Sequence, residues 1–351
     1  MSRTSTSEYT YTPAWWVPGA HLRTLWGKLV RRPPPLTTRI ERWPTSDGDE
    51  IELHRVDPVE GSAHGGRLLV LHGLEGTIQS HYLRGILAQA RQRGWAADAL
   101  IFRTCNGEVT RARRLYHSGE TTDLDCVVQR LVREHRGQPL ALAGFSLGGN
   151  VLLKWLGERG SELPAEVRSA AAVSVPFDLE RGSRFIERGF SRVYTTHFLR
   201  TLRAKARAKL ARDPDLFDAL ALERARTLFA FDDAVTAPVH GFADAADYYR
   251  RSSSIRFLAA LRCPTLLLSA YDDPFLPPEV LSEVAAIAEA NPCLVTEFHE
   301  RGGHVGFIAG HWPWSPRYYA EDRVLSFLRS AISGHRSCDD NRYPVRIASG
   351  R

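Results

Sequence analysis

The chain has 351 residues, of which 43% are hydrophobic, and a formal net charge of +6 at neutral pH. This length suits one α/β core with an insertion, because such sheets often exceed about 200 residues as a single domain. No apolar stretch reaches 18 residues, and the N-terminus lacks the apolar region and cleavage site of a signal peptide, which argues against a membrane-spanning or secreted protein. We therefore expect a soluble, cytoplasmic protein.

Residue spacing gives no sign of a metal or cofactor site. The chain lacks an H-E-x-x-H sequence and both glycine-rich loops that bind nucleotide phosphates. The cysteines are odd in number and scattered, so we expect them to be reduced, with neither a disulfide framework nor a zinc site. They are Cys105, Cys126, Cys263, Cys293 and Cys338. We expect no metal and no cofactor.

The first part of the chain predicts a packed aromatic segment and a hairpin. We expect the aromatic residues of the segment 9–26 to pack into the core rather than to anchor the protein at an interface; they are Tyr9, Tyr11, Trp15, Trp16 and Trp26. Segments around Trp43 and 50–56, with Asp47-Gly48 between them, indicate an antiparallel hairpin at the start of the sheet.

Short apolar runs then alternate with helix-like segments. The runs cover residues 68–71, 97–102, 140–143, 170–175 and 266–268. Strands that are apolar on both faces and separated by helices predict an α/β fold with a mostly parallel sheet flanked by helices.

The sequence Gly144-Phe145-Ser146-Leu147-Gly148 lies between an apolar run and a helix-like segment. This strand-turn-helix context predicts a nucleophile elbow, in which a sharp turn presents the serine hydroxyl at the top of the sheet. The pattern alone is weak, because glycine and serine are common. In such folds the backbone N–H after the serine and another from an early loop bind the oxyanion. We assign these donors to Leu147 and to Leu74 in the loop 72–76.

Between Pro176 and about Ser254 the strand-like pattern is absent. Helix-forming residues with frequent arginine replace it. This change predicts a helical cap inserted after the sixth strand, where substrate choice is commonly set. We divide the chain into core segments 1–175 and 255–334, a cap 176–254 and a flexible tail 335–351. Residues 181–226 contain 12 basic and 5 acidic side chains. This excess raises the hypothesis of peripheral contact with an anionic membrane, but a solvated basic surface is the stronger explanation, because arginine outnumbers lysine throughout the chain.

A serine needs a base and an orienting acid, which follow it in chain order in this type of fold. The run 264–269 ends in an acidic turn at 271–277, from which we choose Asp273 as the acid, with Asp272 as the alternative. A final strand at 294–298 leads into a glycine-flanked His304, the predicted general base. His299 and His311 lie nearby in the sequence. Only the placement of His304 in a glycine loop after the final strand distinguishes it from these two.

Motifs along most of the chain resemble those of the YheT-like branch of the α/β-hydrolases, the AB hydrolase type-four family. They include segments 18–25, 72–76, 116–119 with Asp123, 144–150, 237–242 with Tyr248-Tyr249, 272–275 and 302–307. Thr104 departs from the pattern, because relatives place glycine there. The resemblance implies a serine hydrolase of esters or lipids with Ser146, Asp273 and His304 as catalytic residues.

Together these patterns predict a serine carboxylesterase that forms an acyl-enzyme on Ser146 and acts on a small-molecule ester or lipid, not on nucleic acid. Transfer of the acyl group to an alcohol is the neighbouring alternative. A non-catalytic relative that binds a ligand through its cap is a third interpretation, since fold alone does not establish activity.

Overall fold

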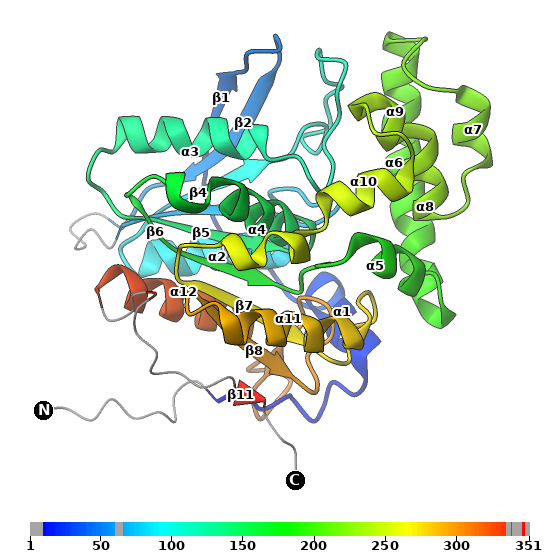
Figure 1. Ribbon diagram of the computed structural model, residues 1–351. Helices are drawn as coiled ribbons and strands as arrows, with labels where there is room; N and C mark the ends of the chain where they lie inside the picture. The colour runs from blue at the N-terminus through cyan, green and yellow to red at the C-terminus, as the bar shows by residue number, and fades with distance from the viewer. Residues whose placement is uncertain (1–9, 60–65, 335–337, 339–345, 348–351) are drawn as a thin grey trace, which may run out of the picture.

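The computed structural model describes residues 10–59, 66–334, 338 and 346–347. Within these residues one nine-stranded sheet has the order β1-β2-β4-β3-β5-β6-β7-β8-β11 (Figure 1). Its strands are β1 (Arg39–Pro44), β2 (Glu50–Val56), β3 (Arg67–Leu71), β4 (Ala96–Ile101), β5 (Leu140–Phe145), β6 (Val167–Val173), β7 (Thr265–Ala270), β8 (Leu294–His299) and β11 (Arg346–Ile347). The strands from β3 to β8 run parallel, whereas β1 and β2 form the predicted antiparallel hairpin. The mostly parallel α/β architecture is therefore confirmed.

The central strands are buried on both faces. Every residue of β3, β5 and β7 is buried, which explains why these segments read as continuous apolar runs rather than as alternating patterns. The covering helices are α2 (His81–Gln92), α3 (Thr122–Glu134), α4 (Leu147–Arg159), α11 (Pro278–Ala290) and α12 (Tyr319–Ile332). Helix α2 contacts α12, α3 contacts α4, and α11 packs against β8.

A helical insertion follows the sixth strand, as expected. It contains α5 (Leu179–Phe185), α6 (Arg192–Arg212), α7 (Ala219–Arg224), α8 (Leu228–Phe231), α9 (Ala237–His240) and α10 (Ala245–Ser252). Helices α6 to α9 stand together at one side of the sheet, in green to yellow-green (Figure 1). They share a small apolar core of their own, which includes Leu199, Leu222 and Phe231. No helix in the described part of the chain is both long and apolar enough to cross a membrane.

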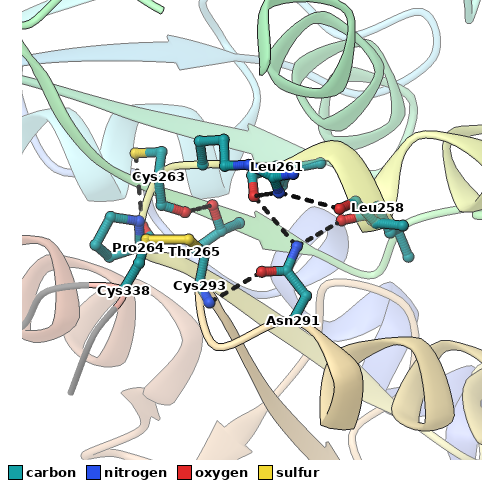
Figure 2. Close-up of a disulfide and its surroundings, with 10 residues drawn as sticks. Leu258, Leu261, Cys263, Pro264, Thr265, Asn291, Cys293 and Cys338 are labelled. Atoms are coloured by element: carbon teal, nitrogen blue, oxygen red, sulfur yellow. Dashed lines mark hydrogen bonds between the residues drawn. A yellow bond between two sulfur atoms is a disulfide. The ribbon is translucent and has the colours of Figure 1, made fainter. Parts of the chain in front are cut away.

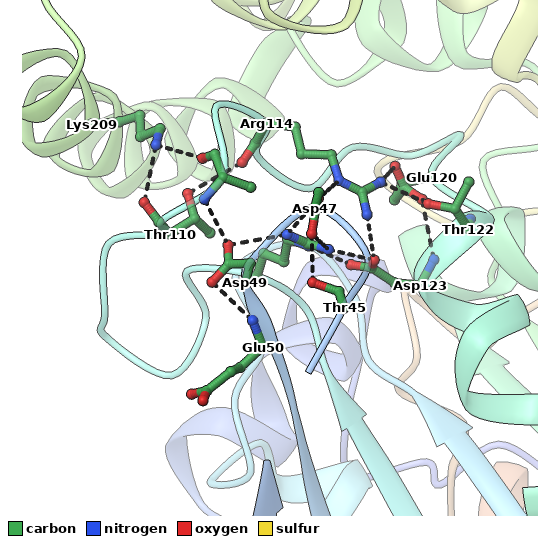
Figure 3. Close-up of polar contacts among 12 residues, drawn as sticks. Thr45, Asp47, Asp49, Glu50, Thr110, Arg114, Glu120, Thr122, Asp123 and Lys209 are labelled. Atoms are coloured by element: carbon green, nitrogen blue, oxygen red, sulfur yellow. Dashed lines mark hydrogen bonds and ion pairs between the residues drawn. The ribbon is translucent and has the colours of Figure 1, made fainter. Parts of the chain in front are cut away.

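A buried lysine joins the insertion to the core. Lys209 of α6 has a fully buried side chain whose ammonium donates to the carbonyls of Thr110 and Ala112, at 3.0 and 2.6 Å (Figure 3). An ion-pair network holds the same loop from the other side, because Arg103 and Arg114 both contact Asp123. This loop leads to Tyr116 and so fixes one wall of the site described below.

The aromatic segment at the start of the chain packs mostly as expected. Tyr11 is buried against Phe307, and Trp16 packs against Trp26 of α1 (Ala20–Leu29). Trp15 differs, because 71% of its surface is exposed. Tyr9 lies outside the described residues.

The C-terminal segment corrects two expectations. Cys293 and Cys338 form a disulfide, so the five cysteines are not all reduced thiols (Figure 2). The strand β8 is not the last of the sheet, because β11 pairs with it in parallel. Both features join residues that are far apart in sequence, 45 positions in the case of the disulfide. The rest of the predicted flexible tail lies outside the described residues.

Candidate active site

Ser146 occupies the sharp turn between β5 and α4, with φ of +52° and ψ of −121°. Its N–H donates to the Val173 carbonyl at 2.8 Å, which holds the turn against the neighbouring strand. A Cβ atom at Gly144 would lie 2.5 Å from the Gly148 carbonyl oxygen, and one at Gly148 would lie 2.5 Å from the His72 carbonyl oxygen. The two glycines are therefore required because backbone segments approach each other too closely for a side chain.

The three residues predicted to act together lie within hydrogen-bond distance. His304 Nε2 is 2.9 Å from Ser146 Oγ, and His304 Nδ1 is 2.8 Å from Asp273 Oδ2. Because a carboxylate only accepts, Nδ1–H donates to Asp273, which leaves Nε2 free to accept the serine proton. The Phe275 ring stacks on the imidazole at a centroid distance of 4.1 Å and limits its rotation. This arrangement can deprotonate a serine hydroxyl.

Asp272 has a different set of partners from Asp273. Its Oδ1 accepts from the backbone N–H groups of Gly302 and Gly303, at 2.7 and 2.9 Å, and its Oδ2 accepts from Arg23. Asp273 is fully buried and receives one further hydrogen bond, from the Phe275 N–H. Asp272 thus shapes the loop that carries His304, while Asp273 contacts the imidazole itself.

Helix α1 braces the histidine loop from the N-terminal side. Thr24 Oγ1 accepts the His304 backbone N–H at 2.9 Å, and Arg23 reaches Asp272 as described. On the opposite side, Ser174 Oγ accepts the Val305 N–H at 3.0 Å. Sequence reasoning assigned no role to these three residues. The motif at 18–25 was a signal for Arg23 and Thr24, but their contacts span more than 240 positions in sequence.

The other two histidines near the end of the chain lie elsewhere. His299 Nε2 contacts Glu297 at 3.1 Å, and its ring packs against Tyr11. His311 offers its carbonyl oxygen to the Trp15 indole N–H. In the described structure neither side chain contacts Ser146.

Two backbone N–H groups beside Ser146 have no hydrogen-bond acceptor among the described residues, those of Leu74 and Leu147. Both residues line the same cavity as Ser146 and His304. Free N–H groups converging near a nucleophile are the donors that a developing oxyanion requires.

Buried His72 fixes the loop that carries Leu74. Its Nδ1–H donates to the Gly73 carbonyl at 2.8 Å, and its Nε2 accepts the Phe102 N–H at 3.1 Å. Burial lowers the pKa of His72 to about 4, so the ring is neutral and can make both contacts. Thr104, in the loop after β4, has φ of +68°, in the left-handed region that glycine adopts without strain.

A cavity of about 590 Å³ opens above Ser146. The insertion supplies both apolar and polar side chains to its lining, and the apolar ones include Ile186, Phe198, Leu202 and Phe231. A cavity of this size holds a small ester or one lipid chain. Within the residues that the structure describes, no group of three histidine, cysteine or acidic side chains is placed to hold a metal ion.

Comparison with known proteins defines the family. The sequence-family model described as the alpha/beta hydrolase fold matches residues 66–310. The chain is 39% identical to YheT of Escherichia coli over 91% of this chain and 92% of that protein. It is 30% identical to the phospholipase ABHD3 of Mus musculus, over 93% of this chain and 79% of that protein. A monoacylglycerol lipase of Saccharomyces cerevisiae is 29% identical over 76% of this chain and 60% of that protein.

Among solved structures, the Pyrococcus furiosus esterase Pf2001 aligns with a TM-score of 0.53 at 16% identity, over 86% of this chain and 100% of that chain, which supports the fold alone. The family match and the relatives agree with the motifs found in the sequence. The chain belongs to the α/β-hydrolase fold family and is a hydrolase of its esterase and lipase type.

Proposed function

We propose that the protein is a serine hydrolase that cleaves short- to medium-chain fatty acyl or lipid esters through an acyl-enzyme on Ser146. The observation that carries this proposal is the continuous hydrogen-bonded line from Ser146 Oγ through His304 to Asp273, at 2.9 and 2.8 Å. The names of two relatives, a phospholipase and a monoacylglycerol lipase, support an ester or lipid substrate.

In the proposed reaction, His304 takes the Ser146 proton as Oγ bonds to the ester carbonyl carbon. The oxyanion forms beside the Leu74 and Leu147 N–H groups, which stabilise it. His304 then gives the proton to the departing alcohol as the ester C–O bond breaks. Water repeats the sequence on the acyl-enzyme and releases the acid, while Asp273 holds the imidazole tautomer and orientation throughout.

The test is a series of p-nitrophenyl esters from acetate to palmitate, assayed with wild type and Ser146→Ala. We expect turnover in wild type only, with an optimum chain length that reports the acyl pocket. Equal background rates in both proteins, together with no labelling of Ser146 by a fluorophosphonate, would contradict the proposal.

Acyl transfer to an alcohol is the second candidate, because the apolar lining of the cavity accommodates an alcohol beside the acyl-enzyme. Adding ethanol to the assay distinguishes the reactions. Ethyl ester as the main product would identify transfer, and free acid alone would identify hydrolysis.

The cap 176–254 is proposed to select the substrate and to contact an anionic membrane. Exposed Phe190 and Val193 flank Arg192 at the start of α6, which combines apolar and basic groups on one surface. Flotation with liposomes should recover more protein on anionic than on neutral lipid. Equal recovery on both would exclude this contact.

A further inference from the structure

Asp232 is a carboxylate in the cavity wall that has no cation beside it. Its oxygens accept hydrogen bonds from the hydroxyls of Thr236 and Tyr249, both at 2.6 Å. In the described part of the chain, no lysine, arginine or histidine lies within ion-pair distance of it. Burial raises the pKa of Asp232 to about 6, so the group is mostly ionised at neutral pH and carries an uncompensated charge.

The surroundings of this carboxylate are aromatic and neutral. We define the Asp232 wall as the cavity-lining residues Phe231, Asp232, Thr236, His240, Tyr248 and Tyr249. The rings of Tyr248 and Tyr249 lie 5.1 Å apart. Burial lowers the pKa of His240 to about 4, so this ring is uncharged at neutral pH. Of the six residues, only Asp232 is then charged.

Other cations that line the cavity have partners of their own, and Lys28 contacts His197 Nε2 at 3.1 Å. Lys205 contacts Glu75 at 2.7 Å, and Arg31 pairs with Glu321. The neighbouring Asp233 has an ordinary structural role, because its Oδ1 accepts the Ala245 N–H at the start of α10 and its side chain is exposed. Asp232 and Asp233 therefore differ in placement although they are adjacent in sequence.

We propose that the Asp232 wall binds a positively charged ammonium group of the substrate whose ester is cleaved at Ser146. A carboxylate has about four lone-pair sites, and the two hydroxyl donors leave capacity for a further partner. Aromatic faces beside a carboxylate bind an alkylated ammonium by cation–π attraction together with ion pairing. This inference rests on the proposed esterase function.

The test compares two esters that differ by one atom, butyrylcholine and 3,3-dimethylbutyl butyrate, in which carbon replaces the charged nitrogen. Wild type should show a kcat/KM at least about tenfold higher for the choline ester, in keeping with the strength of a desolvated cation–π contact plus an ion pair. Asp232→Asn, which keeps the size and an acceptor oxygen, should lower this ratio several-fold, because the ion pair is lost while the aromatic rings remain. Asp233→Asn is the matched control and should leave it unchanged.

A binding measurement separates failure of this inference from failure of the esterase proposal. Calorimetric titration of Ser146→Ala with phenyltrimethylammonium requires no turnover, and adding Asp232→Asn should weaken binding about tenfold or more. If neither ester is cleaved but this loss of affinity appears, the ammonium site stands and the esterase proposal fails. If Asp232→Asn changes neither the ester ratio nor the affinity, the ammonium site is wrong.

Discussion

The Lys205 ammonium on cap helix α6 donates to the Glu75 carboxylate, at 2.7 Å, beside the backbone N–H proposed to bind the oxyanion. Tyr116 closes the arrangement, because its hydroxyl donates to Glu75 Oε1 at 2.6 Å and accepts the Glu75 N–H at 3.0 Å. These contacts hold Glu75 at φ of +56°, a conformation that non-glycine residues rarely adopt. The cap therefore stabilises the loop that carries Leu74.

Replacing Lys205 with methionine should lower kcat about 10- to 100-fold with little change in KM. The expected loss is smaller than the ~10²–10³-fold loss from removing an oxyanion donor, because the Leu74 N–H remains but is less well positioned. Arg207→Met on the same helix is the control, since Arg207 pairs with exposed Glu223. A Lys205→Met enzyme with wild-type kcat would show that this contact does not position the loop.

The two adjacent aspartates should respond differently to amidation. Asp273→Asn should lower kcat by ~10³–10⁴-fold, because an amide at this position no longer fixes the imidazole tautomer. Asp272→Asn keeps an acceptor for the Gly302 and Gly303 N–H groups, so we expect a loss of about tenfold or less, with a lower melting temperature from the weakened Arg23 contact. Steady-state kinetics and thermal unfolding of both variants test this. The reverse order of effects would identify Asp272 as the orienting acid.

Gly148→Ala should be strongly destabilising. Its Cβ would meet backbone oxygens of His72 and Leu71 at 2.5 and 2.7 Å, and backbone cannot move away as a flexible side chain can. We expect a loss of about 3 kcal/mol or more in the free energy of unfolding, at the upper end for overpacked sites. Gly182→Ala in α5 is the control, because its nearest neighbour is 3.9 Å away. Urea unfolding should place the control at or above wild-type stability.

Four histidines, His72 and His117 buried and His81 and His240 partly buried, predict loss of stability in mild acid. Burial lowers the pKa of His72, His81 and His240 to about 4, and that of His117 well below 6.5. Below pH 6.5 the unfolded chain binds protons at these sites while the folded protein does not, so stability falls as the pH drops from about 6.5 to 4 and is unaffected above that window. Each site contributes up to about 1.4 kcal/mol per pH unit.

Asp232 opposes this trend, because its raised pKa means that the folded protein binds a proton from about pH 6 downward, before the unfolded chain does. These five groups together give a net uptake of roughly three protons on unfolding at about pH 5, and urea unfolding at pH 8, 7, 6 and 5 measures the resulting fall in stability. His240→Gln should reduce this uptake by about one proton. Stability that stays constant down to pH 5 would contradict the burial of these rings in neutral form.

The disulfide predicts the number of titratable thiols. Denatured protein that has not been reduced should react at three cysteines, Cys105, Cys126 and Cys263, and reduced protein at all five. Five reactive thiols without a reductant would show that Cys293 and Cys338 are not joined. Because disulfides are uncommon in reducing compartments, protein isolated under thiol-blocking conditions also tests the predicted cytoplasmic location.

Much of the fold was readable from the sequence, because its signals are local. Buried parallel strands appear as short apolar runs, and the elbow appears as small residues around Ser146 between a strand and a helix. The order of serine, acid and histidine along the chain directed attention to three residues that the structure places within hydrogen-bond distance. The strand β11 escaped detection because two residues carry no periodicity.

The sequence by itself determined the fold class, the family and the segments that supply the proposed nucleophile, acid and base. Only the tertiary structure brought Asp273 rather than Asp272 within hydrogen-bond distance of His304, joined Cys293 to Cys338, and set Asp232 in the wall of the cavity that Ser146 also lines. The physical reason is that strand and turn patterns follow from neighbouring residues, whereas these pairings depend on the paths of segments far apart in the chain.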